Sequence, residues 1–191
     1  GGAGIYNGDG SRLSLIDSTV SNNSSGWAGG GIYVFFNANV LIERSTVSGN
    51  SAADVGGGMR TLGNVTIRNS TFSGNSSIGW HGGAAFVTDG TVNVINSTIA
   101  NNSAPAGATG GLFVGTFTAA GVTINLSNSI LANNSDVNCF PGYFGAGAVA
   151  LTSGGHNVAD DASCNMGAAG DKPNVDPLLG ALANNGGPTQ T

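Results

Sequence analysis

The octapeptide "STVSGNSA", residues 45–52, recurs along the chain and decides its fold. Close copies begin at Ser18 ("STVSNNSS"), Ser70 ("STFSGNSS"), Ser97 ("STIANNSA") and Ser129 ("SILANNSD"). Each copy is accompanied by a second phrase rich in small residues, such as "GGGIYV" at 29–34. Equivalent positions of this second phrase are Gly4, Gly31, Gly58, Ala84 and Gly111, at spacings of 27, 27, 26 and 27 residues. A fixed period of this length indicates a solenoid.

Within a repeat, apolar and polar residues alternate with a period of two. In "VTIRNSTFSGN", Val65, Ile67 and Phe72 are expected to point inward. The phase of the alternation changes once per repeat, at Asp17, Arg44, Asn69, Asn96 and Asn128, which predicts a corner between two short strands. β-Branched, Gly-punctuated segments without a period of 3.6 exclude a helical repeat. The sequence therefore predicts an all-β fold, a parallel β-helix of about 27 residues per coil and roughly six coils.

The organisation along the chain follows from the repeats. Residues 1–135 are expected to form five repeat coils, and residues 136–191 an atypical final coil and C-terminal segment of the same domain. The chain opens inside the repeat pattern, with "GGAGIY", and carries no signal peptide, so we expect a mature or trimmed piece of a longer protein.

The low and unclustered positive charge argues against nucleic acid and anionic membranes as partners. Charged residues make up 8% of the chain, the net charge is −5, and the five basic residues do not cluster. Nucleic acid and anionic membranes are therefore not expected as partners, since phosphate binding needs concentrated Lys and Arg. No apolar run approaches the length of a membrane span.

One polar column of the repeat is expected to be structural. Stacking the coils about 4.8 Å apart brings five asparagines to one corner: Asn23, Asn50, Asn75, Asn102 and Asn134. Asn tolerates left-handed backbone geometry, and its amide can bridge the coils on both sides as a ladder. The alternative is N-glycosylation, because several asparagines, such as Asn64 and Asn69, lie in N-x-S/T sequons.

The two cysteines, Cys139 and Cys164, lie 25 residues apart, close to one coil period. Stacking would bring them side by side, so we expect a disulfide and an extracytoplasmic location. Two free buried thiols are the alternative. A zinc site is not expected, because His81 and His156 lack ligand spacing from the cysteines.

The repeat phrases "GGA/GGG-I" and "F-S-G-N" resemble those of polymorphic outer-membrane proteins and related bacterial surface proteins. The stretch from Ser153 to Thr191, "SGGHNVADDASCNMGAAGDKPNVDPLLGALANNGGPTQT", is similar to the closing segment of large secreted or surface-anchored bacterial β-helix proteins. The resemblance implies a right-handed β-helix, an extracellular or cell-surface location and a stalk or adhesin-like role. A fold of this kind hosts many functions.

Many right-handed β-helices degrade polysaccharides, which requires stacked carboxylates. The columns that begin with Asp17 and Ile16 contain no two acids on adjacent coils, and Glu43 and Arg68 are expected to pair diagonally at the surface. Four aspartates of the C-terminal segment are weak calcium candidates, with turn formation as the alternative: Asp160, Asp161, Asp171 and Asp176. No catalytic or cofactor-binding residue is assigned, and His81 and His156 are interpreted as loop residues.

Two outward features are candidate binding surfaces. The first is a T-x-S array, Thr19, Thr46, Thr71 and Thr98 beside Ser21, Ser48 and Ser73, which suits ice binding or simply β-propensity. The second is an aromatic stripe of Tyr6, Tyr33, Arg60, Phe86 and Phe113. Trp27 and Trp80 occupy one loop position two coils apart, hence about 10 Å from each other. These aromatic residues could bind two stacked sugar rings or form a protein interface. They could also pack under a loop, and this explanation is favoured.

The sequence as a whole favours a non-enzymatic extracellular structural or adhesive module of a bacterial surface or secreted protein. The second hypothesis is a carbohydrate-binding or polysaccharide-degrading β-helix, and the third is an ice-binding protein. The expected partners are another protein or a second copy, through the end coils or the aromatic stripe, or a carbohydrate. No cofactor is expected.

Overall fold

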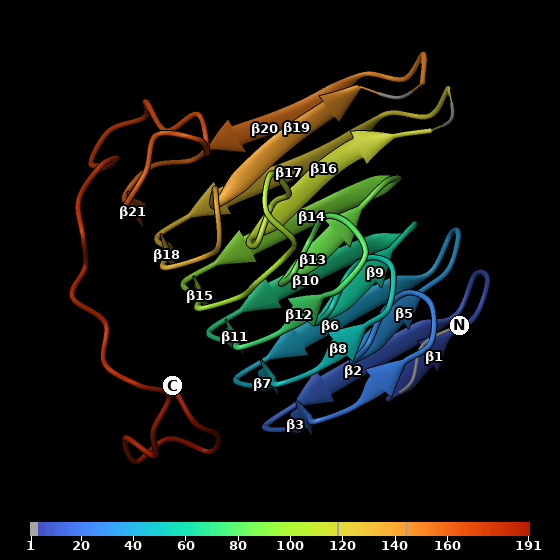
Figure 1. The fold of residues 1–191 in the computed structure, drawn as a ribbon, viewed down its shortest axis with the longest axis horizontal. Coiled ribbons are helices and arrows are strands. Elements are labelled where there is room, and N and C mark those ends of the chain that lie inside the picture. The colour runs from blue at the N-terminus through green and yellow to red at the C-terminus, as the bar shows by residue number, and fades with distance from the viewer. Residues whose placement is uncertain (1–3, 118, 144) are drawn as a thin grey trace.

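The structure, a computed structural model, describes residues 4–117, 119–143 and 145–191. Strands from β1 (Ile5–Asn7) to β21 (Val158–Ala159) make up the regular structure of these ranges. No helix there is long and apolar enough to cross a membrane. The strands form four parallel sheets that run along one solenoid axis (Figure 1).

The first two sheets have six strands each. The first sheet contains, in spatial order, β1, β5 (Ile32–Val34), β9 (Met59–Thr61), β13 (Ala85–Val87), β16 (Leu112–Thr116) and β19 (Cys139–Tyr143). The second sheet contains β2 (Arg12–Ile16), β6 (Asn39–Glu43), β10 (Asn64–Arg68), β14 (Gly90–Ile95), β17 (Val122–Ser127) and β20 (Val149–Ser153).

The other two sheets follow the corner of each coil. The third sheet contains β3 (Thr19–Ser21), β7 (Thr46–Ser48), β11 (Thr71–Ser73), β15 (Thr98–Ala100), β18 (Ile130–Ala132) and β21. The fourth, of three strands, contains β4 (Ser24–Ser25), β8 (Ser51–Ala52) and β12 (Ser76–Ser77). Each sheet takes one strand from each successive coil, which is the topology of a solenoid.

The strand register reproduces the period seen in the sequence. Ile5 pairs with Ile32, and Ile32 with Met59, 27 residues further on in each case. Ala85 pairs with Leu112 and Leu112 with Cys139 at the same interval. The predicted all-β parallel solenoid of about six coils is therefore confirmed.

The core lies inside the coils and is built from the alternate residues of the strands. Val65 and Ile67 of β10 are buried, whereas Asn64 and Arg68 are exposed. Phe72 of β11 is also fully buried, so the inward assignment of all three apolar residues is confirmed. The other coils contribute equivalent residues to one continuous apolar cluster that includes Val40, Ile42, Val92, Val94, Ile124 and Leu126.

The corner between the second and third sheets has left-handed backbone geometry. The φ angles there lie between 46° and 51°, at the five predicted corner residues Asp17, Arg44, Asn69, Asn96 and Asn128. The ladder asparagines themselves, also expected to take this geometry, do not adopt it. Positive φ falls on the residue before each ladder asparagine, such as Gly49 before Asn50 and Asn101 before Asn102.

The glycine-rich phrase is required because its backbone lies too close to the backbone of the next coil to leave room for a side chain. In the third coil, Gly56 has a φ of 69°, and a Cβ at Gly57 would lie 2.4 Å from the backbone of Ser76. A side chain at Gly57 would force the turn away from β12. The recurrence of the phrase in each coil therefore has a steric cause.

The C-terminal segment after β21 leaves the solenoid end and runs back along its side (Figure 1). Its last residues reach the second coil, where the Thr46 hydroxyl donates to the carbonyl of Gln190 at 2.5 Å. The Thr189 hydroxyl donates to the carbonyl of Arg44 at 3.3 Å. The contact between Thr46 and Gln190 joins residues 144 positions apart in the sequence.

Candidate functional site

The predicted asparagine ladder is present. The side-chain amide of Asn50 donates to the Asn75 Oδ1 at 3.0 Å, and that of Asn75 donates to the Asn102 Oδ1 at 2.9 Å. Each of these amide nitrogens also donates to a carbonyl of the preceding coil, as Asn75 does to Val47. Asn23 and Asn134 extend the ladder at its two ends. Every inner member therefore bridges the coils on both sides.

A second ladder, of serines, was not predicted from the sequence. The backbone N–H of Ser45 donates to the Ser70 Oγ at 3.1 Å, and the N–H of Ser70 donates to the Ser97 Oγ at 3.2 Å. The same bond continues from Ser97 to Ser129. The signal was present, because these serines are the first residues of the recurring octapeptide.

The four candidate calcium ligands have other hydrogen-bonded roles. In both ladders each member donates to the equivalent side chain of the following coil, and carboxylates accept at the C-terminal end. Asp160 accepts from the side-chain amide of Asn138, the residue that follows Asn134 in the ladder. Asp171 accepts from the backbone N–H of Asn157, which follows Ser129 in the serine ladder. Because a carboxylate only accepts, these aspartates satisfy the last donors of each ladder.

The remaining two aspartates stabilise turns. Asp161 accepts from the backbone N–H groups of Asn138 and Ser163, and the exposed Asp176 accepts from Leu178. Within residues 4–117, 119–143 and 145–191, no group of three or more His, Cys, Asp or Glu side chains could hold a metal ion. The four aspartates thus do not assemble the calcium site considered from the sequence.

Burial and hydrogen bonding act in opposite directions on Asp171. Burial raises the pKa of this carboxyl, but hydrogen bonds from Ser153, Asn157 and Ala168 outweigh it. The net result is a pKa below the usual value of 3.8. Asp171 therefore stays ionised when it accepts from the serine ladder.

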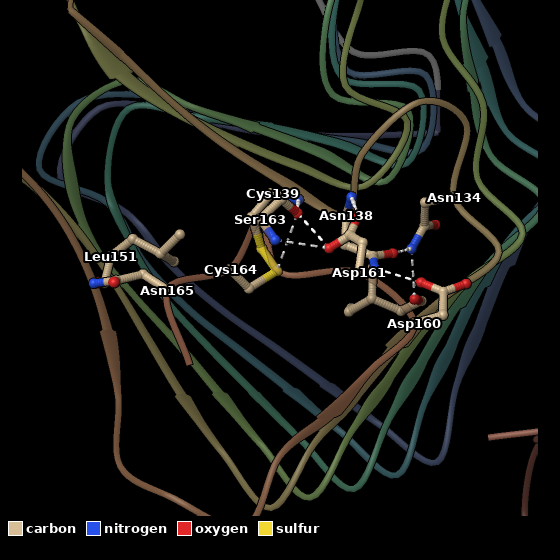
Figure 2. Close-up of a disulfide and its surroundings, with 10 residues drawn as sticks. Asn134, Asn138, Cys139, Leu151, Asp160, Asp161, Ser163, Cys164 and Asn165 are labelled. Atoms are coloured by element: carbon tan, nitrogen blue, oxygen red, sulfur yellow. Dashed lines mark hydrogen bonds between the residues drawn. A yellow bond between two sulfur atoms is a disulfide. The ribbon is translucent and has the colours of Figure 1, made fainter. Parts of the chain in front are cut away.

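The predicted disulfide joins Cys139 of β19 to Cys164 of the C-terminal segment, with 4.9 Å between the Cα atoms. Both residues are buried in the core at the end of the solenoid, beside Leu151. Figure 2 shows the disulfide beside Asp161 and near Asp160, the aspartate that ends the asparagine ladder. The bridge ties the segment across the last coil.

The outward face of the second sheet forms a shallow groove of about 550 Å³. Polar residues of four successive coils line it, among them Arg12, Ser14, Asn39, Asn64, Thr66 and Asn93. Asn64 donates to Asn39 across the groove at 3.4 Å, which leaves hydrogen-bonding capacity for a polar ligand on the outer side of both amides. Asn64 and Asn69, the sequon residues, are exposed.

An ion-pair network lies at one edge of this face. Arg68 contacts Glu43 at 2.9 Å, and the two residues are directly in register rather than diagonal. Arg44 contacts both Glu43 and Asp17. The hydrogen bond from Arg44 is the main cause that lowers the pKa of Asp17. These carboxylates are neutralised by arginine.

The T-x-S array is in register, as Thr46 pairs with Thr71 and Thr71 with Thr98. It is not a fully exposed surface, however. Thr46 and Thr71 are only 1% and 5% exposed, and the C-terminal segment contacts Thr46. This burial does not favour the ice-binding hypothesis, which needs an open array.

The aromatic stripe is in register but mostly covered. Tyr33, Phe86 and Phe113 are buried in a second apolar cluster outside the coil, and the rings of Phe86 and Phe113 stack at 4.4 Å. Tyr6 and Trp27 are more than half exposed. Packing therefore accounts for the middle of the stripe, while its N-terminal part and Trp27 face solvent.

The His81 ring packs against this cluster. Its ring stacks on Phe113 at 4.8 Å, and its Nδ1 accepts from the backbone N–H of Thr109 at 2.9 Å. Burial lowers the pKa of His81 below the usual 6.5. The residue is therefore neutral near pH 7, and its contacts are those of a packed side chain.

Comparison with known proteins gives a single finding. A family model described as "Right handed beta helix region" matches residues 1–162. No curated protein and no solved structure shows significant similarity to the chain.

Proposed function

The chain belongs to the right-handed β-helix family, and on that premise we propose that it is a non-enzymatic structural or adhesive module of a bacterial surface or secreted protein. The family includes enzymes and non-enzymes, so the proposal depends on how this chain uses its polar residues. The observation that carries it is that carboxylates and amides are engaged in the coils: Asp160 and Asp171 terminate ladders, and Asp17 and Glu43 are paired with arginine.

An extracellular location is supported by the disulfide. Cys139 and Cys164 close the end of the solenoid, and disulfides persist in oxidising compartments. The bacterial setting rests on the resemblance of the repeat phrases alone. A rod of hydrogen-bonded coils suits a stalk, because force along the axis is shared by the three six-stranded sheets.

The groove on the second sheet favours a second candidate function, carbohydrate binding or degradation. Its arginines and asparagine amides offer donors to sugar hydroxyls. Degradation would need a carboxylate free to act as acid or base, and Glu43 at the edge of the groove is held by two arginines.

A depolymerisation assay tests the degradation part of the second candidate function. Polygalacturonate, alginate, β-glucan and mannan are incubated with the protein, and new reducing ends and unsaturated products are measured. We expect no product beyond the buffer control. Product formation that disappears in Glu43→Gln or Arg68→Ala would overturn the non-enzymatic proposal and place catalysis in the groove. Ice-crystal shaping, tested in parallel, would support the third hypothesis.

A further inference from the structure

The aromatic stripe is interrupted at one position, Arg60 of β9. In the strand register Arg60 lies between Tyr33 and Phe86, both buried. Its guanidinium carbon lies 5.1 Å from the centre of the Phe86 ring. A positively charged group thus replaces a ring in the middle of an apolar cluster.

The two tryptophans of the chain stand on either side of this interruption. The backbone N–H of Asp54 donates to the Trp27 carbonyl at 2.8 Å, and that of Trp80 donates to the Asp54 carbonyl at 2.9 Å. The three residues therefore hold the same loop position in successive coils. The Trp27 ring stacks on the Tyr33 ring, and the Trp80 ring packs against the Phe86 ring. The space above Arg60 is therefore left open between the two tryptophans.

A pocket of about 180 Å³ fills that space. Its walls include Trp27, Asp54, Arg60, Trp80 and Phe117. The volume is below the 300–1,000 Å³ or so that is typical of drug-sized ligands. The pocket therefore suits one ring-sized group, and the exposed Trp27 and Phe117 at its walls leave room for a longer molecule to continue outward.

Arg60 has unused hydrogen-bonding capacity in this pocket. Its Nε is closed to solvent and has no hydrogen-bond partner among the described residues, so a ligand in the pocket would meet the Nη donors of this half-buried side chain instead. No ion pair within those residues involves Arg60 or Asp54. The guanidinium is held over the Phe86 ring without a carboxylate partner, which leaves its outer donors available to a ligand oxygen.

We propose that this pocket binds a single pyranose ring of a neutral glycan. The C–H faces of a sugar ring pack against indole rings, Arg60 donates to a hydroxyl oxygen, and Asp54 accepts from a hydroxyl. The charges of Arg60 and Asp54 balance, which favours a neutral sugar over an acidic one. This site deepens the adhesive part of the proposed function and rests on it.

Tryptophan fluorescence reports on the pocket directly, because Trp27 and Trp80 are the two tryptophans of the chain. The probes are the neutral tetrasaccharides of β-1,4-glucose, α-1,4-glucose, β-1,4-mannose and β-1,4-galactose, with trigalacturonate as the acidic comparison. We expect a saturable change with at least one neutral probe. No change with any probe, or a change with trigalacturonate alone, would overturn the proposal.

Substitutions assign the binding to this pocket. Arg60→Met removes the donors but keeps an apolar stem over Phe86, and we expect it to weaken binding about tenfold or more, equivalent to about 1.4 kcal/mol. Trp27→Ala, at a half-exposed position, should weaken it similarly. Phe36→Ala is the matched control, since this exposed ring does not line the pocket, and it should leave affinity unchanged.

The same samples distinguish failure of the pocket proposal from failure of the proposed non-enzymatic function. Unchanged affinity in Arg60→Met and Trp27→Ala, with loss in Arg12→Ala, would overturn the pocket and place binding in the groove of the second sheet. Breakdown of the probes would contradict the non-enzymatic function instead. Circular dichroism and thermal unfolding of each variant show whether a loss of binding reflects loss of fold.

Discussion

At the residue scale, single polar side chains connect the coils. Asn75 contacts Asn50 on one side and Asn102 on the other, and it is fully buried. Asp171 accepts several hydrogen bonds at the end of the serine ladder. Asn75 satisfies buried donors, and Asp171 accepts from partly buried ones, so each substitution leaves donors without a partner and has a definable cost.

We expect Asn75→Ala to lower the free energy of unfolding by about 1–3 kcal/mol, because it leaves buried groups on two neighbouring coils without partners. Urea unfolding measures this. Asn64→Ala is the matched control, since Asn64 is an exposed residue of the same coil, and its effect should be smaller. An unchanged unfolding midpoint in Asn75→Ala would remove the energetic role of the ladder.

Asp171→Asn should destabilise the chain by about 1–3 kcal/mol at pH 7, since the amide can accept fewer of the same bonds. The folded-state pKa of Asp171 lies below 3.8. The stabilisation that ionised Asp171 gives to the folded state is therefore complete above pH 3.8 or so. It is lost as the pH falls through the folded-state pKa.

The measurement is urea unfolding of both proteins from pH 7 to pH 2. The difference between wild type and Asp171→Asn should shrink as the pH falls below 3.8. Asp176→Asn, at an exposed turn, is the control and should change little. A difference that stays constant with pH would contradict the assignment.

At the scale of single elements, the last coil differs from the others. β19 and β20 continue the repeat, but the segment after β21 crosses the core end and is held by the disulfide. The segment also supplies Asp160 and Asp171, the acceptors of both ladders. One stretch of irregular chain thus closes the apolar core and ends the hydrogen-bond ladders.

The Cys139→Ser/Cys164→Ser double variant should be less stable by about 3 kcal/mol in the chain-entropy treatment of a loop of this length. Mass spectrometry of the unreduced protein should show a mass two hydrogens below that of the reduced form. Two thiols that alkylate in the native protein would disprove the bridge.

At the scale of the whole molecule, the two end coils are unequal. β1, β2, β3 and β4 each lie at the edge of their sheet. Leu13 and Leu15 of the first coil are partly buried, whereas the equivalent Val40 and Ile42 of the second coil are 4% and 0% exposed. An edge of this kind templates pairing with other strands unless it is covered.

We predict that the first coil is paired in the working assembly, with a second copy, another subunit or another part of the same protein. Hydrogen exchange of the amides of β1 and β2 tests this, with β10 as the internal reference. Protection in the assembly and rapid exchange in the isolated chain are expected. Free exchange around Tyr6 and Leu13 in the native assembly would show that the edge is bare.

The amino-acid sequence by itself determined the coil. It predicts the period near 27, the inward residues, the corners, the asparagine ladder and the disulfide. This is possible because each coil contacts chiefly its neighbours and repeats the same local pattern. The serine ladder was equally legible in the octapeptide, since Ser45 and its equivalents recur as strictly as the asparagines.

Only the tertiary structure decided what happens where the repetition stops. The contact of Gln190 with Thr46 joins positions 144 apart, and the pairing of Asp160 and Asp171 with the ladder ends depends on where an irregular segment turns. The open space above Arg60 depends on the directions in which Trp27 and Trp80 lean. No periodic pattern encodes these features, because side-chain direction and the path of a non-repeating segment are set by packing among residues distant in sequence.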